Sequence, residues 1–141
     1  MQPWILFALL SAVFAAATSI LAKIGIKGID SNLATAIRTV VITLFAWGIV
    51  WAQGTIRQVG SLNKTTWIFL ILSGFATGLS WLFYFRALQL GEASKVVPID
   101  KLSLVLAIIM AIVFLHEKLT LPTFVGSTLI TAGVLVMTLW K

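Results

Sequence analysis

The most regular feature of the chain is a series of long apolar segments separated by short polar stretches. Five such segments cover residues 4–22, 33–52, 67–88, 93–115 and 121–140. Each has about 20 residues, the length that a helix needs to cross a hydrocarbon core about 30 Å thick. Apolar runs this long are typical of transmembrane helices and are too long for strands. The pattern predicts an all-α integral membrane protein with five transmembrane helices.

The polar breaks between these segments are short and carry turn-forming or charged residues. The longest break covers residues 53–64 and holds two glycines and two basic residues. Gly91 and Glu92 form another break, and His116 to Lys118 form the last before Pro122. Consecutive helices are therefore expected to be antiparallel neighbours, within a single transmembrane domain over residues 1–141. No break is long enough for an extramembrane domain.

Composition agrees with a membrane protein and excludes several functions. The chain is 60% hydrophobic and 10% charged, whereas a soluble domain carries about 25% charged residues. The net charge is +6, but its ten Lys and Arg are spread singly between apolar runs, so we expect no nucleic-acid binding.

The sequence contains few residues of the types that catalyse reactions or bind metals. There is no cysteine, one histidine and four carboxylates, and none of these has the spacing of metal ligands. The sequence has no glycine-rich phosphate loop, no Ser-His-Asp set and no paired catalytic carboxylates, and His116 is expected to be a solvated loop residue. We predict no enzyme, no metal and no cofactor.

Charges inside the apolar segments gather near one membrane face. With the N-terminus on side A, a rise of 1.5 Å per residue places the intramembrane charges in one layer near side B. This charged layer consists of Lys23, Arg38, Arg86, Asp100 and Lys101. Long basic side chains can extend to the lipid headgroups, so the basic residues alone allow a lipid-anchoring role as well as a functional one.

Asp100 is the informative member of this layer, because a carboxylate has a short stem and cannot extend far toward the surface. It should face protein or water and take a partner, for which Lys101, Arg86 and Arg38 are candidates. The pair with Lys101 has either a functional role or a structural one in holding its helix. Pro98 precedes it and predicts a kink over residues 96–100, which a transporter site could use or which could be simple bending.

Two further patterns concern packing and recognition. Gly74 and Gly78 have the G-x-x-x-G spacing that permits close helix approach, and Trp81 and Tyr84 follow on one face as pocket wall or interface aromatics. The last segment carries small or hydroxylated residues and suits a packing or dimerisation helix better than a substrate wall. These residues are Gly126, Ser127, Thr131 and Gly133.

Several stretches in this order resemble a known family. They are Ser19–Asp30, Ala34–Val41, Leu72–Gly91, Ala93–Leu106 and Phe114–Thr120. With them the chain resembles the EamA-type proteins of the drug/metabolite transporter superfamily in their half-length, single-repeat form. A ten-helix member is similar to two such units fused, so the resemblance implies one half of an inverted-repeat transporter that moves small metabolites by alternating access.

The odd helix number bears on assembly. Two five-helix units joined end to end have opposite orientations, so a free unit needs an antiparallel partner to reproduce an inverted repeat. Basic residues near the loops give only a small orientation bias. Arg57, Lys64 and Lys118 favour side A inside, and Lys23, Lys27, Lys95 and Lys141 favour side B inside. We expect a homodimer with dual topology in the cell (inner or plasma) membrane.

The charge balance suggests the substrate class. Small multidrug exporters resemble a four-helix version that uses a carboxylate in the first helix, but this chain has no acid in residues 4–22. Its basic layer favours an anionic or zwitterionic metabolite. The predicted substrate-binding residues are Arg38, Trp81, Tyr84, Arg86, Asp100 and Lys101, and Asp100 is the predicted coupling group. The alternative is a non-transporting accessory subunit or lipid-flippase component, which would not move solute in liposomes by itself.

Overall fold

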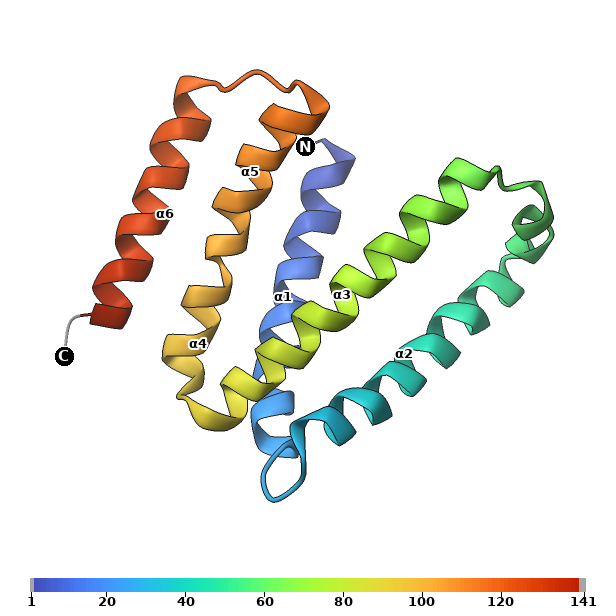
Figure 1. Ribbon diagram of the computed structural model, residues 1–141, viewed down its shortest axis with the longest axis horizontal. Helices are drawn as coiled ribbons and strands as arrows, with labels where there is room; N and C mark the ends of the chain where they lie inside the picture. Colours follow the sequence, from blue (N-terminus) through green and yellow to red (C-terminus); the bar gives the residue numbers. More distant parts are fainter. Residues whose placement is uncertain (1, 140–141) are drawn as a thin grey trace. The chain divides into compact units, whose positions relative to one another are not determined.

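A computed structural model describes residues 2–139 and contains a helix for each predicted segment (Figure 1). The elements are α1 (Pro3–Gly25), α2 (Ser31–Ala52), η1 (Thr55–Ser61), α3 (Lys64–Leu90), α4 (Ala93–Asp100), α5 (Leu102–Leu115) and α6 (Leu121–Leu139). With α4 and α5 taken together, five helical spans are long and apolar enough to cross a membrane. No strand occurs within residues 2–139. The predicted all-α fold with five transmembrane helices is confirmed.

The helices extend beyond the apolar runs where capping residues allow it. α2 begins at Ser31 because the Asp30 carboxylate accepts hydrogen bonds from the backbone N–H groups of Asn32 and Leu33 at 2.9 and 3.1 Å. The turn before it uses Gly28 at a φ of 79°. The helix bounds predicted from hydropathy differ from the observed bounds by up to three residues, because some helices begin earlier or end later than the apolar runs. The predicted end at residue 140 and the charge at Lys141 lie outside the described residues.

The predicted kink is present, and its centre lies at Lys101, directly after the predicted range 96–100. Pro98 has no N–H, so the helix loses the hydrogen bond to the carbonyl four residues earlier. The backbone tightens instead: Lys101 N donates to Pro98 O and Leu104 N donates to Lys101 O, both at 3.0 Å. Figure 1 shows the interruption between α4 and α5.

The helices group into two units, one ending at Leu90 and one beginning at Gly91. In the first unit α3 packs against both α1 and α2, and η1 lies against the end of α2. Its buried residues gather where α1 ends, α2 begins and α3 ends. They are Ser19, Ala22, Ile26, Ser31, Ala34, Thr35, Phe85 and Leu88. The apolar side chains in the opposite halves of these helices are mostly exposed.

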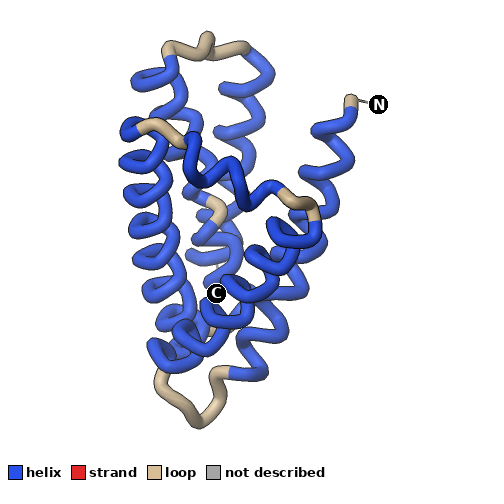
Figure 2. The backbone as a smooth tube through the Cα atoms, turned by 90° about the vertical axis from the view of Figure 1, so that its right-hand side faces the viewer, coloured by secondary structure: helices blue, strands red, loops and turns tan. Residues whose placement is uncertain are grey.

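The second unit contains α4, α5 and α6, and α6 packs against both α4 and α5. α5 ends at His116, which adopts the left-handed conformation at a φ of 54°. Its N–H and that of Glu117 both turn back to the Ala111 carbonyl. α6 then starts after Thr120, whose Oγ1 accepts from the Thr123 N–H at 3.3 Å. The connections between helices are short throughout, as Figure 2 shows.

The glycine pair of α3 does not pack within this chain. A Cβ atom placed on Gly74 or Gly78 would meet nothing within 4 Å. The close helix approach that the G-x-x-x-G spacing permits is therefore absent among the described residues, and this face of α3 is open.

Candidate functional site

The packed centre of the first unit is formed by two residues of α3. Phe85 is 1% exposed and Leu88 is 0% exposed. They continue the helical stripe of Trp81 and Tyr84, because positions three, four and seven apart lie on one face of a helix. This stripe faces the end of α1 and the beginning of α2, which positions the polar groups described next.

Arg38 places its guanidinium over the Phe85 ring, with Cζ 4.3 Å from the ring centroid. The negative face of the ring attracts the cation. The Nε atom of Arg38 is buried and has no hydrogen-bond partner among the described residues. A buried N–H without an acceptor is costly, so this arginine offers a donor that a carboxylate or phosphate oxygen would satisfy.

Tyr84 joins α3 to α1. Its Oη lies 2.6 Å from Ser19 Oγ, and Ser19 donates its own hydroxyl hydrogen to the Ala15 carbonyl at 3.0 Å. Tyr84 is therefore the donor to Ser19. Its ring meets Phe85 edge-on, with centroids 5.5 Å apart. The sequence suggested a pocket wall or an interface aromatic, and the structure adds a bond between helices that neither interpretation included.

Two further cations of the charged layer, Lys23 and Arg86, lie at the end of α3. Lys23 Nζ donates to the Leu88 carbonyl, and Arg86 Nη1 donates to Gln89 Oε1 at 2.7 Å. Gln89 Nε2 in turn donates to the Ile29 carbonyl at 2.7 Å. Lys23, Arg38 and Arg86 thus all contact residues 85–89 of α3, in agreement with the common level expected for them.

Arg38 and Arg86 nevertheless have different surroundings. Arg86 follows Phe85 directly, and one residue turns a helix by about 100°, so its side chain leaves the packed stripe and is exposed. It extends to Gln89, toward the end of α3. Trp81 is half-buried on the same stripe as Phe85.

Asp100 and Lys101 belong to the second unit. Their Oδ2 and Nζ atoms are 3.4 Å apart, and the side chains are 34% and 55% exposed. Lys101, Arg86 and Arg38 were the three candidate partners of Asp100. Among the described residues, Asp100 forms its ion pair with Lys101. The pair lies at the break between α4 and α5, where the backbone leaves the regular helical pattern.

Sequence reasoning missed Phe85, Leu88 and Gln89. The first two lie on the same helix face as Trp81 and Tyr84, but the sequence did not mark this face as the packed one, because lipid-facing positions are equally apolar. Gln89 gave no signal, because its partner Ile29 is 60 positions away and contributes only a backbone carbonyl. Within residues 2–139 no cluster of His, Cys, Asp or Glu could hold a metal ion.

The five helical spans are long and apolar enough to cross a membrane, which identifies a multi-pass membrane protein. The chain belongs to the EamA-like transporter family, whose sequence profile matches residues 2–139. This establishes the resemblance noted from the sequence and points to a membrane transporter, not an enzyme.

Three relatives give this assignment detail. An "uncharacterized transporter in cobO 3' region" of Sinorhizobium sp. is 50% identical over 136 residues, which cover 96% of each chain. An uncharacterized protein of Methanocaldococcus jannaschii is 28% identical over 105 residues, covering 68% of this chain and 77% of the other. The uncharacterized transporter YvbV of Bacillus subtilis is 38% identical over 65 residues, covering 46% of this chain and 21% of the other. No solved structure matches.

Proposed function

We propose that the protein is a secondary transporter of a small polar, anionic or zwitterionic metabolite, working by alternating access as an antiparallel homodimer. The observation that carries the proposal is Arg38, a guanidinium stacked on Phe85 with a buried, unpartnered Nε. The family and the names of the relatives support transport. The proposed negative charge of the substrate is inferred from Arg38.

The depth of Arg38 makes a bound anion favourable. It lies seven residues after the start of α2, which is about 10 Å along the helix axis. A charge at such a depth needs a partner or water, and the planar fork of arginine can bind a carboxylate or phosphate with two hydrogen bonds. An apolar or planar part of the substrate would rest on Trp81 or on the Tyr84 ring, whose hydroxyl is already bonded to Ser19.

The other predicted residues have secondary roles in this proposal. Arg86 and Lys101 would add positive potential or a further contact to the substrate. Asp100 would be the group whose protonation or pairing changes during transport, because its ion pair with Lys101 is only partly exposed and lies at a helix break.

Two observations support the homodimer. The 65 aligned residues make up 46% of this chain but only 21% of YvbV, so YvbV is more than twice as long as this chain. A second copy would supply the missing length. The open face of α3 at Gly74 and Gly78 would let another helix approach closely, since no atom of the described residues lies within 4 Å of a Cβ placed at either glycine.

Replacing Gly74 or Gly78 with leucine should lower the dimer fraction in membranes several-fold. A leucine prevents the close backbone approach that small residues permit. The folded monomer should tolerate it, since nothing lies within 4 Å of either position. Crosslinking in membranes measures the dimer, and Gly48→Leu on α2, also in open space, is the matched control. A wild-type protein that is monomeric in membranes would contradict the homodimer.

Transport itself is tested with the purified chain alone. A screen of small carboxylates, phosphates and amino acids by thermal shift in detergent should find solutes that raise the melting temperature, because binding to the folded state stabilises it. The best solutes should then be taken up by liposomes that contain only this protein. If a bound solute is never transported without a second protein, the accessory-subunit interpretation replaces the transporter.

A further inference from the structure

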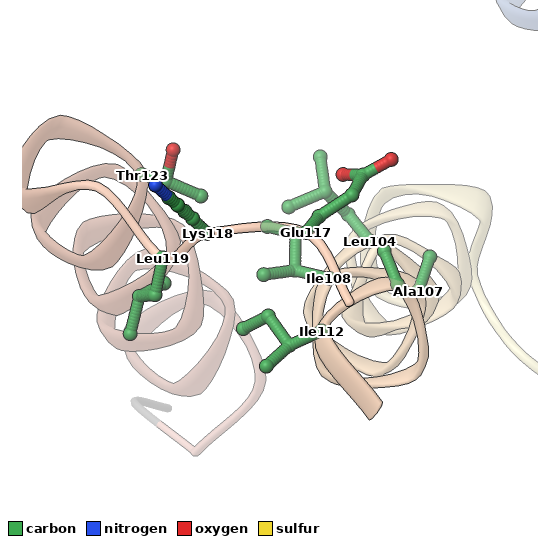
Figure 3. A pocket seen from close by; sticks show the side chains of 9 residues that line it. Leu104, Ala107, Ile108, Ile112, Glu117, Lys118, Leu119 and Thr123 are labelled. Carbon is green, nitrogen blue, oxygen red and sulfur yellow. The ribbon is translucent and has the colours of Figure 1, made fainter. Parts of the chain in front are cut away.

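The second unit contains a hollow that the proposed transport site does not use. It runs between α5 and α6 and consists of two adjoining volumes of about 330 and 490 Å³, which share Ile108, Ile112 and Leu119 as lining residues. We call it the α5–α6 groove. Figure 3 shows the smaller volume, with Leu104, Ala107, Ile108 and Ile112 on one wall and Leu119 and Thr123 on the other.

We propose that the α5–α6 groove binds one acyl chain of a zwitterionic phospholipid, whose headgroup lies between Glu117 and Lys118. This inference does not depend on the proposed transport function. It rests on the chemistry of the groove walls, the depth of the groove and the charges at its mouth.

The walls offer an occupant almost only apolar contact. On α5 they consist of aliphatic side chains. On α6 they include Ser127, Thr128 and Thr131, but each hydroxyl already donates to a backbone carbonyl of its own helix, at 2.9 Å in all three cases. The hydrogen atoms of these hydroxyls are therefore not available to a ligand. A hydrocarbon chain loses no hydrogen bond in such a groove, whereas a polar ligand would.

The groove crosses most of the hydrocarbon core but not all of it. Its larger volume follows α6 as far as Leu135, which lies 14 residues after the start of the helix at Leu121, or about 21 Å from the loop. The hydrocarbon core is about 30 Å thick, so the groove extends from the loop past the middle of the bilayer. An acyl chain has this reach, whereas a spanning helix of a second copy would continue beyond the end of the groove.

The mouth carries one charge of each sign. The loop between α5 and α6 connects two spanning segments, so it lies at the membrane surface. Glu117 and Lys118 are neighbours in the chain, yet neither forms an ion pair among the described residues. In Figure 3 the Lys118 side chain lies beside Thr123 on the α6 side, and the Glu117 carboxylate extends on the α5 side. This arrangement fits a phosphate at Lys118 and an ammonium group at Glu117.

The loop is held in a defined conformation, which fixes where these charges stand. The N–H of Glu117 donates to the Ala111 carbonyl at 3.3 Å, after the left-handed His116. On the other side the hydroxyls of Thr120 and Thr123 are 2.8 Å apart. The two charged residues thus lie between anchored helix ends and line the loop end of the smaller volume.

The test compares palmitoyl-oleoyl phosphatidylethanolamine with the corresponding phosphatidylglycerol, which lacks the ammonium group. Native mass spectrometry of the full chain should find one retained phosphatidylethanolamine per chain. Ala132→Phe occupies part of the larger volume of the groove and should lower retention about tenfold, or ~1.4 kcal/mol. Glu117→Gln should leave total lipid retention intact and reduce the preference over phosphatidylglycerol by about two- to fivefold, as expected for a surface charge pair.

Ala16→Phe, the same substitution at an exposed position of α1, is the control and should retain lipid like the wild type. Added phosphatidylethanolamine should raise the melting temperature of the wild type and of Ala16→Phe, but not of a folded Ala132→Phe protein. Equal retention by all variants, or no retained lipid in the wild type, would overturn the proposal. So would an Ala132→Phe protein that keeps its lipid and loses its dimer, because the groove would then belong to a second copy.

Discussion

Replacing Arg38 with lysine should weaken substrate binding by about tenfold or more, equivalent to roughly 1.4 kcal/mol. The guanidinium lies over Phe85 with Cζ 4.3 Å from the ring centroid, and its buried Nε has no acceptor among the described residues. An ammonium group is a compact charge without the planar fork, so it can neither stack in this way nor offer two parallel N–H groups to a carboxylate or phosphate. Because the substitution keeps the positive charge, the loss of affinity would report the contribution of the guanidinium geometry.

The measurement is substrate affinity, by thermal shift or binding titration, in variants that remain folded. Arg57→Lys in the exposed η1 segment controls for the substitution itself and should leave affinity unchanged. Arg86→Lys should have a smaller effect than Arg38→Lys, because Arg86 is exposed and bonded to Gln89. If both Arg38→Lys and Arg86→Lys bind substrate like the wild type, the anion site is wrong and these arginines serve the lipid boundary.

Replacing Asp100 with asparagine should abolish the dependence of uptake on the driving ion while solute exchange continues. Asparagine has nearly the same shape and can still accept a hydrogen bond from Lys101, whose Nζ is 3.4 Å from Asp100 Oδ2. It cannot gain or lose a proton. The hydrogen bonds described at the helix break join backbone atoms of Pro98, Lys101 and Leu104, so the substitution should leave the backbone unchanged.

Glu92 offers a matched control on the same helix. It forms an ion pair with Lys95 at the same distance of 3.4 Å, but its side chain is 72% exposed at the start of α4. Glu92→Gln should therefore leave ion dependence intact. A merely structural Asp100 would show the opposite result to the one proposed: Asp100→Asn would lower the melting temperature and leave ion-driven uptake unchanged.

The span pattern could be predicted because lipid leaves the backbone few choices. Without water, each backbone N–H and C=O must bond within its own segment, so an apolar run of about 20 residues becomes a helix. The same reasoning located the kink, because Pro98 removes a hydrogen bond wherever the helix lies. It also placed Lys23, Arg38 and Arg86 at one level, since depth follows from residue count along a helix.

Which helices touch, and through which residues, was not in the sequence. In a soluble helix the apolar stripe marks the packed face, but here the faces toward lipid and toward neighbouring helices are equally apolar. Periodicity therefore could not distinguish the buried Phe85 from the exposed Phe83, or show that the glycines of α3 lie in open space.

The five membrane spans and the charges near one end of the helices follow from the amino-acid sequence, because hydrophobic length and backbone hydrogen bonding act locally along the chain. Three features came from the folded chain instead: Arg38 lies over Phe85, Tyr84 bonds to Ser19 across 65 positions, and α5 and α6 enclose a groove. These contacts depend on how each helix is rotated about its axis. That rotation is set by packing between segments distant in sequence, which no local pattern records.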